Sequence, residues 1–227
     1  MKNVSIVTGG ASGLGKEVVR LLVQKGENVC IIARDITKIK NTVNEIGGDV
    51  QYFAGDVSDE SFITSVFSSL KENRYYVNYL YNCAGKGIFG APEDMRLSQV
   101  MEVFNSNAIG LMNITYEACR NMTEGGTIVN VMSTAALKGN ANESLYCASK
   151  WAARGFTEAL RAFYKKSNIY IIGVYPGGIN TPFWSPDCGL SPDVSKFMDP
   201  AEVAATIVQN VAEKKTMYSA DITLERL

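Results

Sequence analysis

A tyrosine and a lysine stand four residues apart in the segment SLYCASKWAARG, residues 144–155. If this segment is helical, Tyr146 and Lys150 lie on one face, one turn apart. A free tyrosine hydroxyl has a pKa near ~10, which a nearby ammonium lowers by favouring the phenolate. The pair could therefore exchange a proton with a substrate. Taken alone, the spacing is that of an ordinary amphipathic helix, and other residues must give it a catalytic meaning.

The 227-residue chain contains no histidine. This excludes a Ser-His-Asp triad and a Cys-His nucleophile pair, and it removes the commonest neutral zinc ligand. General acid-base chemistry must then fall to Tyr, Lys, Asp, Glu or Cys. Tyr146 is the natural proton donor, and no metal site is predicted.

Composition indicates a soluble globular protein, with 46% hydrophobic and 20% charged residues and a formal net charge of −1. Such a balance offers no surface for nucleic acid or anionic membranes. The five cysteines are widely spaced and form no C-x-x-C pair, which favours free thiols in a reducing compartment. Because no run approaches the ~18 apolar residues of a membrane span, a cytoplasmic location is expected.

Short apolar runs alternate with helical patterns along the whole chain. Strands are expected at 3–9, 28–34, 50–56, 77–85, 126–133, 169–177 and 221–226, and helices at about 14–25, 37–46, 59–72, 98–121, 144–165 and 200–212. Strands that are apolar on both faces belong in a covered parallel sheet. Strict alternation predicts one doubly wound α/β domain over 1–227, with ligands bound at the carboxyl edge of the sheet.

One long segment, TPFWSPDCGLSPDVSKFMDP at 181–200, resists regular structure because of its prolines and Gly189. Loops of this length are usually lids or disordered. Three aromatic residues, Phe183, Trp184 and Phe197, favour a short substrate lid that packs on the rest of the protein.

The segment TGGASGLG, residues 8–15, lies where the first strand should meet the first helix. Gly9, Gly13 and Gly15 would let a pyrophosphate approach the backbone N–H groups of a helix N-terminus, which a Cβ would block. A tight strand-to-helix turn is the alternative. The position after the first strand favours nucleotide binding.

Two residues at the end of the second strand bear on the nucleotide. An acidic residue there would bind a ribose 2′-hydroxyl, whereas an arginine would accommodate a 2′-phosphate. Both are present, as Arg34 and Asp35. Asp56, after the third strand, could accept from an adenine amino group or could form an Asx turn or helix cap.

Several motifs together resemble the short-chain dehydrogenase/reductase family: TGGASGLG, NCAG (82–85), Asn107, Ser133, YCASK (146–150) and PGGINT (176–181). Their order and spacing match over essentially the whole chain. The resemblance implies a Rossmann fold with a seven-stranded parallel sheet and NAD(P)-dependent hydride transfer between a carbonyl and an alcohol. One departure is Cys83, where the family usually has a second asparagine.

The resemblance gives four residues a catalytic part. Tyr146 is the acid, and Ser133 donates a hydrogen bond to the substrate oxygen as charge grows there. Lys150 lowers the pKa of Tyr146 and also holds the nicotinamide ribose hydroxyls. Asn107 anchors a water chain that relays protons to Lys150.

The same resemblance supplies the binding residues. Those expected at the cofactor are Thr8, Gly9, Ser12, Gly13, Leu14, Gly15, Arg34, Asp56, Val57, Asn82, Ala84, Gly85, Tyr146, Lys150, Pro176, Gly177, Ile179 and Thr181. Those expected at the substrate are Ser133, Ala135, Tyr146, Gly178, Phe183 and Trp184. NADP(H) is preferred over NAD(H) because Ala33, where members that prefer NAD carry aspartate, precedes Arg34.

The expected function is an NADP(H)-dependent reductase or dehydrogenase acting on a small to medium, uncharged or aromatic carbonyl compound. The alternatives are a regulatory protein that senses NADP(H) and an epimerase or dehydratase that uses the cofactor transiently.

The family commonly forms homodimers or homotetramers through the helix at 144–165 and the long one before it, and the same is expected here. In the helix at 144–165, we expect an apolar stripe to face the sheet. We expect Trp151, Ala153 and Gly155 of the same helix to meet another subunit. The stripe comprises Leu145, Ala148, Ala152, Phe156, Ala159, Leu160 and Phe163.

Overall fold

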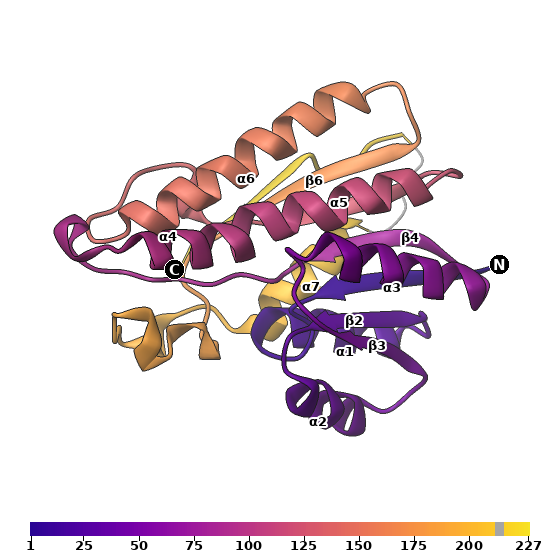
Figure 1. The fold of residues 1–227 in the computed structure, drawn as a ribbon, viewed down its shortest axis with the longest axis horizontal. Coiled ribbons are helices and arrows are strands. Elements are labelled where there is room, and N and C mark those ends of the chain that lie inside the picture. The colour runs from indigo at the N-terminus through magenta and orange to yellow at the C-terminus, as the bar shows by residue number, and fades with distance from the viewer. Residues whose placement is uncertain (212–215) are drawn as a thin grey trace.

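The computed structural model describes residues 1–211 and 216–227. Its strands form one parallel seven-stranded sheet in the order β3-β2-β1-β4-β5-β6-β7 (Figure 1). The strands are β1 Lys2–Thr8, β2 Val29–Ala33, β3 Val50–Ala54, β4 Tyr75–Asn82, β5 Gly126–Val131, β6 Ile169–Pro176 and β7 Asp221–Leu224. The predicted doubly wound Rossmann fold is confirmed.

Helices cover both faces of the sheet, with α3, α5 and α6 on one side and α1, α2 and α7 on the other (Figure 1). They are α1 Gly13–Gln24, α2 Ile36–Ile46, α3 Glu60–Glu72, α4 Leu97–Phe104, α5 Gly110–Asn121, α6 Ser144–Phe163 and α7 Pro200–Val211. Strands β1 to β6 supply hydrophobic side chains to both cores; in β1, for example, Ile6 packs into one and Val7 into the other. This explains why the strands are apolar on both faces. Residue 212 of the predicted last helix lies outside the described residues.

The strand order reverses beside β1, which pairs with β2 on one side and β4 on the other. The first half of the chain winds outward to β3, and the second half returns to β4 and winds outward to β7. A crevice forms at the carboxyl ends of strands where such a reversal occurs. The residues with candidate chemistry lie at this edge.

The predicted continuous helix at 98–121 is interrupted. A π-helical turn at Asn105–Ile109 separates α4 from α5, and the N–H of Gly110 donates to the carbonyl of Asn105. A Cβ at Gly110 would lie 2.3 Å from Cγ2 of Val57, so only glycine lets this turn pack so closely. π-Helical turns are rare and frequently mark functional sites.

The apolar stripe predicted for α6 is only partly correct: Leu145, Phe156 and Leu160 pack against the rest of the protein, but other members of the stripe do not. The side chains that face the protein interior include Tyr146, Ser149, Lys150, Ala153 and Thr157, whereas Ala148 and Ala159 are exposed and Phe163 is 79% exposed. Hydrophobicity alone failed here because the buried face carries polar groups with hydrogen-bond partners. Ala153, which was expected to meet another subunit, is fully buried.

The segment 181–200 is irregular, as its prolines predict. Short 3₁₀ turns occur at Pro182–Trp184, Pro186–Cys188 and Val194–Lys196. A parallel bridge between Ile179 and Met198 brings the two ends of the segment together at the carboxyl edge of the sheet. Among the described residues, none of the helices combines the length and apolarity needed to cross a bilayer.

Candidate active site

An open cleft of about 1130 Å³ runs along the carboxyl edge of the sheet. Its walls include the glycine turn, Arg34, the loop after β4, the start of α6 and the segment after β6. Tyr146, Lys150 and Ser133 all line it. Residues far apart in the sequence therefore converge on one space large enough for a dinucleotide and a small substrate.

The glycine turn places the N-terminus of α1 at the cleft. Gly9 and Gly13 have φ angles of +67° and +51°, which favour glycine. A Cβ at Gly15 would lie 2.5 Å from the carbonyl oxygen of Gly9. The turn thus requires glycine at these three positions and leaves backbone N–H groups facing a space that suits a phosphate.

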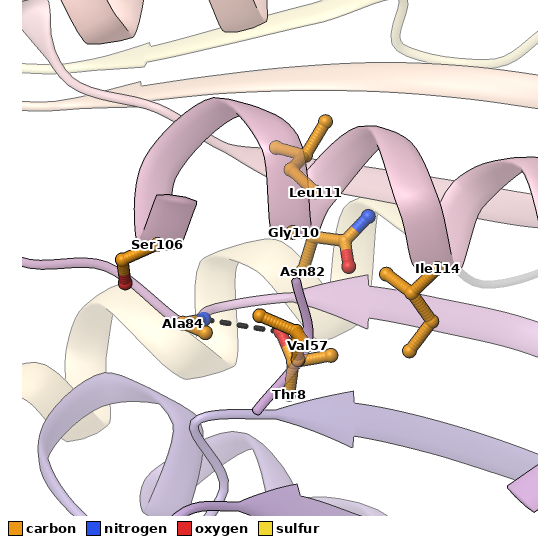
Figure 2. A pocket seen from close by; sticks show the side chains of 8 residues that line it. All are labelled: Thr8, Val57, Asn82, Ala84, Ser106, Gly110, Leu111 and Ile114. Atoms are coloured by element: carbon orange, nitrogen blue, oxygen red, sulfur yellow. Dashed lines mark hydrogen bonds between the residues drawn. The ribbon is translucent and has the colours of Figure 1, made fainter. Parts of the chain in front are cut away.

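Thr8 and Asn82 lie behind the cleft wall. Oγ1 of Thr8 accepts hydrogen bonds from the N–H groups of Cys83 and Ala84, both at 3.1 Å. Thr8 and Asn82 line a small separate void with Val57, and Figure 2 shows the Asn82 amide between the end of β4 and the helix carrying Gly110. These residues shape the loop that borders the cleft, whereas Ala84 and Gly85 line the cleft itself.

Asn82 also belongs to a buried polar chain. Its Nδ2 donates to Oγ1 of Thr115 at 3.0 Å and to Oδ1 of Asn130 at 2.9 Å. Nδ2 of Asn130 in turn donates to Oγ1 of Thr157 at 2.9 Å. This series of hydrogen bonds connects β4 and β5 to α5 and α6. It therefore fixes the position of α6, which carries Tyr146 and Lys150, against the sheet.

The cleft near β2 carries two cations. Arg34 lines it together with Lys38, a residue that sequence reasoning missed. Asp35 accepts from the N–H groups of Thr37 and Lys38 at 2.9 and 3.1 Å, so its carboxylate caps α2. A strand one residue longer would have placed Asp35 at the ribose, but β2 ends at Ala33.

Asp56 forms the Asx turn that was one of its two alternatives. Its Oδ1 accepts from the N–H and the hydroxyl of Ser58 at 2.8 and 2.7 Å. Neither Asp56 nor Val57 lines the large cleft, and Val57 packs under Gly110 instead. Their predicted cofactor contacts therefore have no support from the geometry.

Tyr146, Ser133 and Lys150 form the chemical centre of the cleft. Ser133 and Tyr146 line the cleft together, and Ser133 acts to lower the pKa of the Tyr146 hydroxyl. The Nζ of Lys150 lies 5.7 Å from the centre of the Tyr146 ring and donates to the carbonyl of Val131 at 3.3 Å. The arrangement places a hydroxyl donor, a phenol and an ammonium together, which can protonate an oxygen and stabilise negative charge on it.

Burial shifts the pKa values of both Tyr146 and Lys150. It raises the pKa of Tyr146 well above its ordinary value, against a lowering by Ser133. Burial lowers the pKa of Lys150 to about 8. The net shift of the Tyr146 pKa is therefore upward and not the lowering that was expected, because burial removes the phenolate from water.

Asn107 is 1% exposed and lies behind Lys150, in the π-helical turn. Its Oδ1 accepts from the N–H of Lys86 at 2.7 Å, and its Nδ2 donates to the carbonyl of Lys86 and to Oγ of Ser149. Ser149 donates to the carbonyl of Tyr146 at 2.7 Å. The amide thus joins the loop after β4 to α6; Ser149 was not singled out from the sequence.

The loop after β4 differs from its prediction at Cys83. Because β4 ends at Asn82, Cys83 follows the strand and lines the cleft. Burial raises the pKa of its thiol to about 12, against a lowering by Lys150. A Cβ at Gly85 would lie 3.5 Å from Nζ of Lys150, so this loop passes directly over the lysine.

The segment after β6 closes the other side of the cleft. Pro176, Gly177, Gly178, Ile179 and Thr181 line it. Thr181 touches the glycine turn, since a Cβ at Gly13 would lie 3.1 Å from the Thr181 Cβ. The two motifs most distant in sequence therefore meet across the cleft.

The predicted substrate residues cluster at Tyr146. Phe183 and Trp184 line the cleft, and Ala135 is buried in the same apolar cluster. Phe89 packs edge-on against the Tyr146 ring, with 5.3 Å between centroids. Its place in a loop at the binding edge makes it a candidate substrate contact from the sequence. Within residues 1–211 and 216–227, no group of three or more Cys, Asp or Glu side chains is placed to hold a metal ion.

A family model described as short chain dehydrogenase matches residues 3–187. A human (Homo sapiens) 3-oxoacyl-(acyl-carrier-protein) reductase is 34% identical over 80% of this chain and 77% of its own. Carbonyl reductase family member 4 from Xenopus laevis is 33% identical over 92% of this chain and 90% of its own. An actinorhodin polyketide ketoreductase, solved with NADPH, is 26% identical with a TM-score of 0.88 over 98% of this chain and 95% of its own.

Proposed function

Because the chain belongs to the short-chain dehydrogenase/reductase family, we propose that it reduces a small to medium carbonyl compound with NADPH, and oxidises the alcohol in reverse. The observation that carries this proposal is the convergence of Tyr146, Ser133 and Lys150 in a cleft that begins at a glycine cradle. The cradle fits a dinucleotide, since a Cβ at Gly9, Gly13 or Gly15 would occupy the space or strain the turn.

The residues that would hold the cofactor follow from the cleft wall. The turn from Gly9 to Gly15 would bind the pyrophosphate, Ala84 and Gly85 the adenosine ribose, and Ile179 with Thr181 the carboxamide of the nicotinamide. Lys150 would hold the nicotinamide ribose hydroxyls. The bound cofactor supplies the hydride.

The chain's own residues supply position and the proton. Ser133 and Tyr146 would both bind the carbonyl oxygen, and Tyr146 would give it a proton from its hydroxyl. A raised pKa keeps the phenol protonated at neutral pH, as an acid requires. The Lys150 ammonium would offset the phenolate that remains, and Asn107 would fix Lys150 and Tyr146 through the π-helical turn and Ser149.

Removing the phenolic hydroxyl tests this assignment. Tyr146→Phe should lower kcat for reduction of any accepted carbonyl by at least ~100-fold, the lower range for a general acid, with NADPH binding unchanged. Turnover would be followed by NADPH absorbance and binding by NADPH fluorescence. A variant with near-normal turnover would show that another group donates the proton.

Preference for NADPH is proposed from the two cations near β2. Arg34 and Lys38 both line the cleft, and Asp35, the residue that would repel a 2′-phosphate, is engaged as the helix cap. A charged hydrogen bond to phosphate contributes about 1.5–3 kcal/mol.

We therefore expect Arg34→Ala with Lys38→Ala to lower the ratio of kcat/KM for NADPH over NADH by about 100-fold or more. NADH kinetics should change little, which provides the internal control. A wild-type protein that already favours NADH would refute this use of the two cations.

We also propose that the whole chain forms one Rossmann-type domain in which the segment 181–200 acts as a lid over the substrate. Copies of the chain associate as dimers or tetramers through α4, α5 and α6, where large apolar side chains remain exposed: Leu97, Met101, Tyr116, Trp151 and Phe163. A cytoplasmic location stays a prediction.

A further inference from the structure

Five aromatic side chains pack into one cluster beside the Tyr146 hydroxyl, here called the aromatic cluster: Phe89, Tyr146, Phe183, Trp184 and Phe197. Ring centroids lie 5.7 Å apart for Tyr146 and Phe183, 5.1 Å for Phe183 and Trp184, and 5.3 Å for Trp184 and Phe197. Three of these rings come from the segment 181–200. The proposed proton donor therefore stands at one end of a continuous row of rings.

Trp184 is held in place from several sides. Its Nε1–H donates to the carbonyl of Ile179 at 3.0 Å, and its ring stacks on Phe89 with 15° between the planes and 5.5 Å between centroids. Phe197 packs against it edge to face, and Arg226 lies over the Phe197 ring. Trp184 is thus a fixed wall, not a freely rotating side chain.

Phe89 is the buried support of this wall. It is 4% exposed, and its N–H donates to the carbonyl of Cys188 at 2.8 Å, which fastens the segment 181–200 to the loop after β4. The fastening needs Gly189, which has a φ of +82° and whose Cβ would lie 2.4 Å from the Phe89 carbonyl oxygen. The backbone itself therefore sets where the rings stand.

The rings that face the cleft are Phe183, Trp184 and Phe197, together with Tyr146. A carbonyl oxygen placed at the Tyr146 hydroxyl would bring the substituent on its carbon against these rings. Aromatic pairs gain from edge-to-face and offset stacking in addition to the apolar area they bury. A flat conjugated ring would gain this here, whereas a saturated ring of the same size would gain apolar burial alone.

We propose that the aromatic cluster makes this protein select carbonyl compounds whose carbonyl carbon bears a flat aromatic ring, with Trp184 as the specificity-determining residue. The inference rests on the proposed function. In the reaction, hydride from NADPH forms the new C–H bond and Tyr146 transfers its proton to the oxygen. An aryl ketone thus becomes a secondary alcohol, and NADPH becomes NADP⁺.

Two ketones with equal carbon counts test the proposal: acetophenone, with a flat ring, and cyclohexyl methyl ketone, with a saturated one. We expect wild-type kcat/KM to favour acetophenone by about tenfold, the size of one good aromatic contact. Trp184→Leu, apolar but not aromatic, should reduce the ratio to about twofold or less, and Trp184→Phe should retain most of it. Trp151→Leu, the same change at the other tryptophan, should leave the ratio unchanged.

A second measurement does not depend on turnover. In Trp151→Phe, Trp184 is the sole tryptophan, so its emission reports on the aromatic cluster. With NADP⁺ present, 1-phenylethanol should change this emission saturably at concentrations about tenfold lower than 1-cyclohexylethanol. Equal responses to the two alcohols would overturn the proposal even if Trp184→Leu fails to fold.

The kinetic outcomes separate this proposal from the proposed function. Wild-type protein that reduces other carbonyl compounds but shows no preference for acetophenone, or reduces neither ketone, would overturn the aromatic selection alone. An unchanged ratio in Trp184→Leu would do the same. Absence of turnover on every carbonyl compound, with NADPH still bound, would refute the proposed reduction. The titration of Trp184 emission would then test by itself whether the aromatic cluster binds flat ligands more tightly than saturated ones.

Discussion

At Lys150, burial and function oppose each other. The side chain is 4% exposed, and burial lowers its pKa from 10.5 to about 8. The proposed chemistry needs the ammonium, because it must offset the negative charge left on Tyr146. The protein therefore holds this lysine where burial disfavours its charge, and strongly shifted pKa values of this kind cluster at functional sites.

A pH dependence follows from this position. As pH rises through about 8, Lys150 loses its proton, so kcat/KM for NADPH in the reductive direction, which reports the free enzyme, should fall. Between about 8 and 10.5 the unfolded chain binds more protons at this lysine than the folded one, so this lysine makes the free energy of unfolding rise with pH there. Activity and the contribution of Lys150 to stability thus change in opposite directions.

Lys150→Arg is the matched test, since arginine stays charged over this range. Whatever rate the variant retains should lose the fall near pH 8, and the rise in stability should disappear with it. Rate profiles and denaturant unfolding at several pH values would measure both. A wild-type rate that stays flat to pH 10 would show that the charge on Lys150 is not required.

Among the elements, the interrupted helix from α4 to α5 positions the site most directly. The π-helical turn carries Asn107, whose amide reaches both Lys86 and Ser149. Gly110 allows the turn to pack on Val57. The sequence predicted one continuous helix here, because one extra residue in a helical turn leaves hardly any trace in the spacing of apolar residues.

Gly110→Ala should be destabilising, although glycine to alanine within a helix usually stabilises by about 0.5–1 kcal/mol. The new methyl group would lie 2.3 Å from the Val57 Cγ2 and 2.9 Å from the Asn105 carbonyl oxygen. Overpacking of this kind costs about 1–3 kcal/mol. kcat should fall as well, because Asn107 lies in the displaced turn.

Val57→Ala provides the control in a double-mutant cycle. Because it removes the methyl group that the new Cβ would meet, the double variant should be at least ~0.5 kcal/mol more stable than the sum of the single changes predicts. Urea unfolding would measure all three variants. Additive effects, or a stabilising Gly110→Ala, would contradict this account of the turn.

At the scale of the whole molecule, large apolar side chains on α4, α5 and α6 are exposed to solvent in a single copy of the chain. Tyr116 and Phe156 pack edge to face across α5 and α6, and Trp151 is 47% exposed nearby on α6. Figure 1 shows these helices running side by side along one layer. A second copy packed here would bury them.

Trp151→Glu should therefore shift the protein towards monomer in analytical ultracentrifugation. A central aromatic anchor contributes about 2–4 kcal/mol, so the dissociation constant should rise by at least ~30-fold. Tyr52→Glu is the matched control, because Tyr52 is a similarly exposed aromatic residue on the edge strand β3. A monomeric wild type, or equal effects of the two changes, would remove this surface as the interface.

The sequence by itself determined the order of strands and helices, the parallel doubly wound sheet, the glycine turn and the position of the Tyr146–Lys150 pair. These features depend on local periodicity, on backbone conformations that favour glycine, and on motif spacing, all of which can be read along the chain. Tertiary structure alone decided the π-helical turn, the polar buried face of α6 and the support of Trp184 by Phe89. Each of these depends on which atoms meet across elements far apart in sequence, and burial there even reversed the expected direction of the Tyr146 pKa shift.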